Sequence, residues 1–217
     1  MDEETPLILT PVNFFQFAFE LHKIDLQPLA SLGKRLSHPK YRLPDLSGLC
    51  AEEAFAEIYM GWAEQGLAIH VLCNETFNRV SYPDVTRGDS LELFLDTRDV
   101  KTSGYNTRYC HHFYCLPESI EGHQAGEITH FRTEDAHEWC NHEDLEVKAS
   151  KHSGSYSLTL IIPSHCMTGY DPENFNRIGI SYRVNRTVGP QQHFSAVSEE
   201  FQIEQQPSLW ASFKLIP

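Results

Sequence analysis

The sequence is short of basic residues. Of its 217 residues, 17 are Lys or Arg and 30 are Asp or Glu, which gives a formal net charge of −13. An acidic balance of this size disfavours the phosphates of a nucleic acid and an anionic membrane surface as partners. No stretch approaches the ~20 apolar residues that a membrane-spanning helix needs. We therefore predict neither a nucleic-acid partner nor a membrane partner.

The N-terminus lacks the marks of a secretory signal, which are a basic start and an apolar core. It reads Met1-Asp-Glu-Glu-Thr-Pro6, and the apolar stretch 7–9 is short and soon followed by Pro11. This pattern predicts a cytoplasmic protein, or one that is exported by a route without a classical signal. In a reducing compartment the six cysteines are expected to be free thiols.

Motifs for catalysis are also missing. The chain has no Gly-x-Ser-x-Gly elbow, no phosphate-binding loop and no dinucleotide fingerprint. Glu92 and Asp96 would lie on one strand face, but ~13 Å apart at roughly 3.3 Å per residue, which is too far for a pair of glycosidase carboxylates. Because no nucleophile, base and orienting group can be placed together, we predict no enzymatic activity and no cofactor.

Most of the chain from residue 54 onward alternates apolar and polar residues, the period of half-buried strands. A hairpin is predicted at 55–73, and further strands are predicted at 87–96, 107–116, 127–132, 145–149, 156–162, 178–184 and 209–215. About eight short strands with turn signals between them predict an all-β fold, an antiparallel sandwich or barrel with few short helices. The best helix candidate is 27–36.

The first ~50 residues have no clear pattern of their own. They contain Phe14, Phe15, Phe17 and Phe19, which are expected to pack against the β-structure. We therefore predict a single domain over 1–217, in which 51–217 is the core and 1–50 is an extension that packs on it.

The segment Thr107-Arg-Tyr-Cys-His-His-Phe-Tyr-Cys-Leu116 is rich in histidine and cysteine. In a strand, His111 and His112 point to opposite faces, so both cannot serve one site. Two interpretations stay open: buried, hydrogen-bonded histidines, or a ligand platform on one face. Further His and Cys residues follow, but their spacings match no recognised zinc knuckle, so no metal site is predicted. Those residues are His123, His130, His137, Cys140 and His142.

Several motifs in order resemble a known group of proteins. They are Trp62-Ala-Glu-Gln-Gly-Leu-Ala-Ile-His-Val71, Gly88-Asp-Ser-Leu-Glu-Leu-Phe-Leu-Asp-Thr-Arg-Asp99, Ile161-Ile162-Pro163 and Ile178-Gly-Ile-Ser-Tyr-Arg-Val-Asn185. The sequence over about 53–215 resembles the family-nine carbohydrate-binding-module superfamily, which is related to DOMON domains. The resemblance implies a two-sheet, jelly-roll-like β-sandwich. It also implies sugar binding between aromatic side chains, sometimes with structural calcium, and relatives that bind haem.

We therefore expect a non-catalytic binding module for a carbohydrate or another small polar ligand. A protein-interaction module and a haem- or metal-binding relative are the alternatives. Alternation over 178–184 turns Tyr182 inward and Arg183 toward solvent or a groove. Trp62 and Trp210 are expected in the core and Trp139 at the surface. The predicted ligand-binding residues are Arg108, His112, Trp139, Arg183, Asn185, Gln192 and His193.

Overall fold

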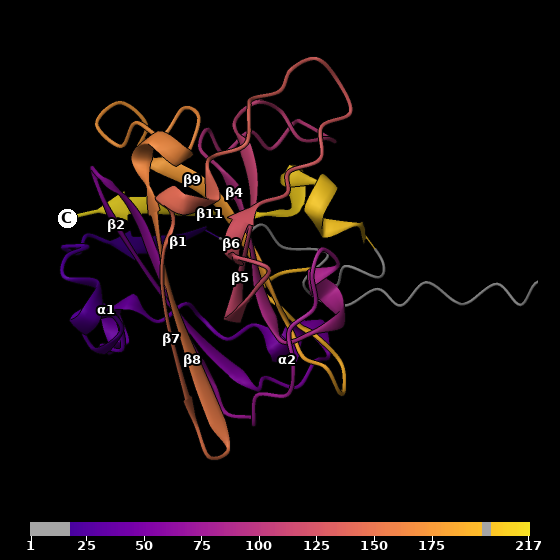
Figure 1. The fold of residues 1–217 in the computed structure, drawn as a ribbon. Helices are drawn as coiled ribbons and strands as arrows, with labels where there is room; N and C mark the ends of the chain where they lie inside the picture. Colours follow the sequence, from indigo (N-terminus) through magenta and orange to yellow (C-terminus); the bar gives the residue numbers. More distant parts are fainter. Residues whose placement is uncertain (1–17, 197–200) are drawn as a thin grey trace, which may run out of the picture.

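The computed structural model describes residues 18–196 and 201–217, and their strands form two sheets (Figure 1). The larger sheet has the order β1-β11-β9-β4-β5-β6, with β10 paired to β9, and the smaller has the order β2-β3-β8-β7. The larger sheet consists of β1 (Ala18–His22), β4 (Ser90–Asp96), β5 (Cys110–Ile120), β6 (His123–Glu127), β9 (Arg177–Asn185), β10 (Gln192–His193) and β11 (Ala211–Ile216). The smaller consists of β2 (Ala56–Ala63), β3 (Gly66–Cys73), β7 (Glu146–His152) and β8 (Ser155–Pro163). The predicted two-sheet sandwich is confirmed.

Helical structure is scarce in the described residues, as predicted. The α-helices are α1 (Leu29–Leu36) and α2 (Ser47–Cys50). Single 3₁₀ turns span Pro39–Tyr41, Val85–Arg87, His142–Asp144, Ser164–Cys166, Ile203–Gln205 and Pro207–Leu209. None of the described helices is long and apolar enough to cross a membrane.

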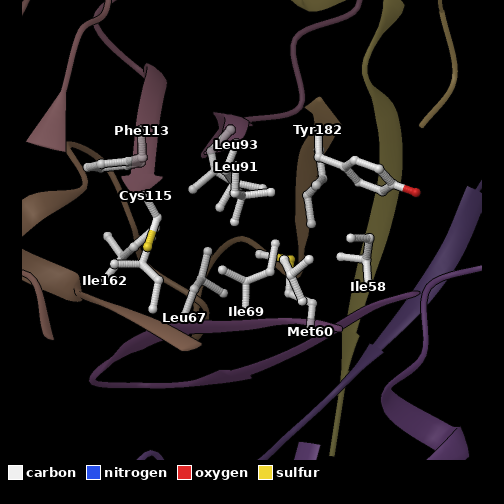
Figure 2. Close-up of a cluster of buried hydrophobic side chains, with 14 of the residues drawn as sticks. Ile58, Met60, Leu67, Ile69, Leu91, Leu93, Phe113, Cys115, Ile162 and Tyr182 are labelled. Atoms are coloured by element: carbon white, nitrogen blue, oxygen red, sulfur yellow. The ribbon is translucent and has the colours of Figure 1, made fainter. Parts of the chain in front are cut away.

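The hydrophobic core lies between the two sheets. Figure 2 shows apolar side chains of the larger sheet facing those of the smaller one. The alternation of side chains along each strand determines which residues point inward, since every second side chain of a strand points to the same face. Each large apolar side chain that is buried in this way contributes about 1.5–3 kcal/mol. The labelled members are Leu91, Leu93, Phe113, Cys115 and Tyr182 from the larger sheet and Ile58, Met60, Leu67, Ile69 and Ile162 from the smaller.

The β2–β3 hairpin forms where predicted, but one strand lies elsewhere. The sequence pattern predicts a strand at 127–132, whereas β6 spans His123–Glu127. The reason is the tight turn after β5, in which Glu121 and Gly122 both have positive φ (52° and 88°). Two such residues in succession are typical of the two-residue turns that join hairpin strands. The turn therefore starts the returning strand at His123.

The described part of the first 50 residues contributes to both layers. β1 pairs in parallel with β11, so the predicted antiparallel pairing does not hold at this one pair of described strands. Leu21 of β1 lies in the core between the sheets. Helix α1 covers the outer face of the smaller sheet, where Leu32 and Leu36 pack with Tyr59 and Ile161.

The outer face of the larger sheet is also covered, here by the chain that leads into β11. Ile203 and Trp210 pack there against Phe94 of β4 and Cys110 of β5. The indole Nε1 of Trp210 donates to the carbonyl oxygen of Ile203 at 2.8 Å, which holds this segment in place. The face that the sequence pattern predicts as polar is therefore largely enclosed.

Candidate functional site

Three of the predicted site residues meet around one buried carboxylate, that of Glu92 on β4. Arg183 of β9 donates to both of its oxygens, from Nε at 2.6 Å and from Nη2 at 2.8 Å. His112 Nε2 lies 2.9 Å from Oε1, and Asn185 Nδ2 donates to Oε2 at 2.7 Å. Cross-strand register explains the meeting, because Arg183 lies directly opposite Glu92.

The predicted strand facing is confirmed, because Tyr182 points into the core and Arg183 to the other face. The expectation that Arg183 is open to solvent or to a groove is wrong, since its side chain is only 9% exposed. Chain packed on the outer face encloses it, and the carboxylate of Glu204 lies 3.9 Å from its Nη1. Alternation distinguishes the two faces of a strand, but it does not reveal what later segment covers the polar one.

Electrostatics keep Glu92 ionised. Burial by itself would raise the pKa of this carboxyl group. Hydrogen bonds and charge from His112 and Arg183 outweigh burial and hold the pKa of Glu92 well below its usual range. The paired guanidinium and carboxylate form a closed bidentate ion pair, the strongest geometry available to these two groups. This cluster supports the sheet and leaves few hydrogen-bonding positions for a ligand.

Gln192 and His193 of β10 make a different set of contacts. The Gln192 side-chain oxygen accepts from the backbone N–H groups of Phe55 and Ala56 at 2.8 Å each, and its Nε2 donates to the Ala56 carbonyl oxygen at 2.9 Å. His193 Nδ1 lies 2.6 Å from Glu52 Oε1. Both side chains are buried, and both fasten the chain before β2 to the edge of the larger sheet.

A small pocket lies next to Gln192. It has a volume of about 170 Å³ and is lined by Phe55, Tyr182, Gln192, Arg42 and Glu57 among others. Pockets for drug-sized ligands usually measure ~300 Å³ or more. The pocket is therefore large enough for ordered water or a very small ligand.

Trp139 lies in the loop 128–145 between β6 and β7, and it is 57% exposed, the most exposed large aromatic side chain among the described residues. Its indole Nε1 donates to the Thr129 carbonyl oxygen at 2.9 Å, so the ring is anchored at one edge. Trp62 and Trp210 are 8% and 1% exposed. The expected exposure of Trp139 and burial of the other two are confirmed.

Arg108 is tied to the same loop. Its exposed guanidinium pairs with Asp135 of the loop, and its carbonyl oxygen lies 2.7 Å from His137 Nδ1. The structure therefore divides the predicted site residues into three places. Trp139 belongs to the 128–145 loop and Arg108 contacts that loop. His112, Arg183 and Asn185 surround Glu92, and Gln192 and His193 hold the chain at the start of β2.

Two groups of side chains in the described residues have a spacing that suits a metal ion. They are His111, Glu127 and His137, and Asp144, His165 and Cys166. Sequence reasoning missed Glu127 and assigned no role to His111 beyond the choice of face. The three members of the first group come from β5, β6 and the 128–145 loop, so no short spacer connects them.

The chain matches no protein-family model and no curated protein sequence. Its two-sheet sandwich is the fold of carbohydrate-binding modules of family 9. A family 9 module from Caldicellulosiruptor kristjanssonii in complex with cellotriose superposes with a TM-score of 0.61 at 12% identity, over 92% of this chain and 93% of that one.

Two further solved structures give the same result. The family 9 module from C. kristjanssonii in complex with glucose has a TM-score of 0.59 and 13% identity, over 92% of this chain and 95% of that one. A candidate carbohydrate-binding protein from Bacteroides uniformis ATCC 8492 has a TM-score of 0.60 and 8% identity, over 93% and 100%. At these identities the likeness establishes the fold, and the expected fold-level resemblance is confirmed.

Proposed function

We propose that this protein is a non-catalytic module that binds a carbohydrate on the 128–145 loop, with Trp139 as its main contact. The observation that carries the proposal is the exposed indole of Trp139, held by its hydrogen bond to Thr129. Tryptophan combines a large apolar ring with a polar N–H and is enriched at binding interfaces, so its exposed ring makes the loop a candidate binding surface. The fold shared with sugar-binding modules supports the same conclusion.

The chemistry of the loop suits a sugar. An indole face packs against the C–H face of a pyranose ring, and its Nε1 edge is already bonded to the protein, so the ring is held in advance of binding. Arg108 supplies N–H donors and Asp135 supplies carboxylate acceptors for hydroxyl groups. Their ion pair is exposed, so rearranging it costs little.

The buried carboxylates support a role without catalysis. Glu92 and Glu127 are 1% and 5% exposed; Glu92 accepts from Arg183 and Asn185, and Glu127 accepts from the Thr129 hydroxyl and the Cys140 backbone N–H. A general acid or base must reach the proton that it transfers, within hydrogen-bond distance of the substrate. In this proposal, His112, Arg183, Asn185, Gln192 and His193 stabilise the sandwich, and Arg108 and Trp139 contact the ligand.

The test is a saccharide array followed by isothermal titration calorimetry on the best hits. We expect Trp139→Ala to weaken binding at least about 30-fold, because truncating a central aromatic contact costs about 2 kcal/mol or more. The matched control is Phe175→Ala, which removes another exposed aromatic ring, 43% exposed, from a different loop. Equal affinity of wild type and Trp139→Ala would overturn the proposal. An array without any hit would instead favour a protein-interaction module.

A further inference from the structure

The carboxylate of Glu127 at the end of β6 is surrounded by two imidazoles. His111 Nδ1 lies 3.0 Å from its Oε1, and His137 Nε2 lies 2.7 Å from the same oxygen. The Thr129 hydroxyl donates to this oxygen at 2.6 Å, and the Cys140 backbone N–H donates to Oε2 at 3.0 Å. The side chains of His111 and Glu127 are fully buried, and that of His137 is 7% exposed.

The hydrogen bonds of His137 are not satisfied by a neutral ring. Its Nδ1 lies 2.7 Å from the Arg108 carbonyl oxygen, which can only accept, so Nδ1 carries the proton. A neutral imidazole has one N–H, so Nε2 would then direct a lone pair at the Glu127 carboxylate 2.7 Å away. Three arrangements remove this repulsion: a second proton on a nearly buried ring, a proton on the Glu127 carboxyl group, or a cation between Nε2 and Oε1.

The outer hydrogen bonds are those that metal-bound histidines make. Histidines that bind a metal usually give their other ring N–H to a carbonyl oxygen or a carboxylate, which fixes the tautomer and the ring orientation. His137 does so with Arg108, and His111 Nε2 lies 3.5 Å from the Thr168 carbonyl oxygen. The Cys140 N–H fixes the carboxylate through Oε2, which leaves Oε1 to face both imidazoles.

We propose that His111, Glu127 and His137 bind one divalent transition-metal ion of the zinc type. Two imidazole nitrogens and one carboxylate oxygen form a set of donors that zinc prefers. The three ligand atoms lie within 4.8 Å of one another. In a tetrahedral zinc site, ligand atoms stand about 3.4 Å apart, given metal–ligand distances of ~2.0–2.2 Å. The present separations of 2.7 and 3.0 Å from Oε1 would need to widen by about 0.7 and 0.4 Å to reach that spacing.

Such an ion would connect three segments that are distant in the sequence, because its ligands come from β5, β6 and the 128–145 loop. His137 is two residues from Trp139, so the ion would also restrain the loop on which the proposed saccharide site lies. The metal site itself does not depend on that proposal, since its ligands are defined by their own geometry. Binding of the metal can therefore be tested without a saccharide.

The experiment measures zinc in the full chain, purified without a polyhistidine tag after growth with added zinc. Elemental analysis is expected to give about one zinc per chain, and replacement by Co²⁺ is expected to give the visible absorption of a cobalt–imidazole site. Competition with a chromophoric chelator then gives the affinity. We expect His137→Ala to weaken zinc binding by more than about 100-fold, since even outer-shell changes cost 10–100-fold.

Two control variants test whether the loss of zinc affinity is specific to the proposed ligands. His130→Ala removes an exposed histidine of the same loop, and His165→Ala removes a member of the second cluster. Both are expected to keep wild-type affinity. If His137→Ala fails to fold by circular dichroism, Glu127→Gln decides, since its amide oxygen can still accept from the Cys140 backbone N–H while its NH₂ group, which does not bind zinc, takes the place of Oε1. Wild-type protein that binds no zinc, or zinc binding lost in His165→Ala but kept in His137→Ala, would overturn the proposal.

Discussion

The ion pair of Arg183 and Glu92 gives the sharpest prediction about stability. Arg183→Ala removes both donors of the bidentate pair and leaves a carboxylate that is 1% exposed, with His112 and Asn185 as its remaining partners among the described residues. Breaking a buried pair by removing one member costs about 3–5 kcal/mol, because the remaining charge stays buried without its counter-charge. An exposed arginine would cost less than about 0.5 kcal/mol. A buried, paired Arg183 and an exposed Arg183 therefore predict losses in the free energy of unfolding that differ severalfold.

Urea denaturation followed by circular dichroism measures this difference. With a slope of about 2 kcal/mol per molar urea, a loss of ~4 kcal/mol lowers the midpoint by about 2 M. The matched control is Arg177→Ala, which removes an exposed arginine of the same strand and should leave the midpoint nearly unchanged. Arg183→Lys keeps the charge but not the planar fork, so an intermediate loss is expected. A loss below 1 kcal/mol in Arg183→Ala would refute the reasoning.

Three further predictions concern other parts of the chain. Burial lowers the pKa of His70 to about 4, so on acidification the unfolded chain binds a proton at this histidine before the folded chain does. The free energy of unfolding should therefore fall by about 1–2 kcal/mol from pH ~7 to ~5. Denaturation at both pH values should show a smaller loss in His70→Gln. Gly33→Ala puts a Cβ 2.8 Å from His70 Cε1 and should cost about 1–3 kcal/mol in thermal or urea unfolding, whereas Gly48→Ala, with open space around it, should not. A 51–217 fragment should be degraded in limited proteolysis, because it lacks two elements that pack on the sandwich. These are β1, which pairs with β11, and α1, which covers the smaller sheet. A stable, soluble fragment would contradict this.

Most of the fold could be predicted from the alternation of apolar and polar residues along each strand. The hairpin of β2 and β3 and the facing of β9 follow from side chains that alternate every residue, since a one-residue slip would expose the apolar row. β1 was missed because its five residues pair in parallel with the last strand, some 190 residues away. Nothing in a five-residue pattern specifies a partner at that distance.

The site was predicted less completely than the fold, for a similar reason. Exposure of Trp139 followed from its polar neighbours in the sequence, and His111 and His112 were correctly assigned to opposite faces. The cover over Arg183 comes from the segment around Ile203 and Trp210, which no local pattern links to β9. The grouping of His111, Glu127 and His137 likewise depends on register and on the path of a loop.

The most direct test of carbohydrate binding uses tryptophan emission. Trp62 and Trp210 are buried, so a ligand that stacks on Trp139 should change the emission mainly of that residue. Titration with glucose, cellotriose and the best saccharide from the array is expected to give a saturable change in wild type that is lost in Trp139→Ala and kept in Phe175→Ala. A saturable change that persists in Trp139→Ala, or no saturable change with any saccharide, would contradict the proposed function.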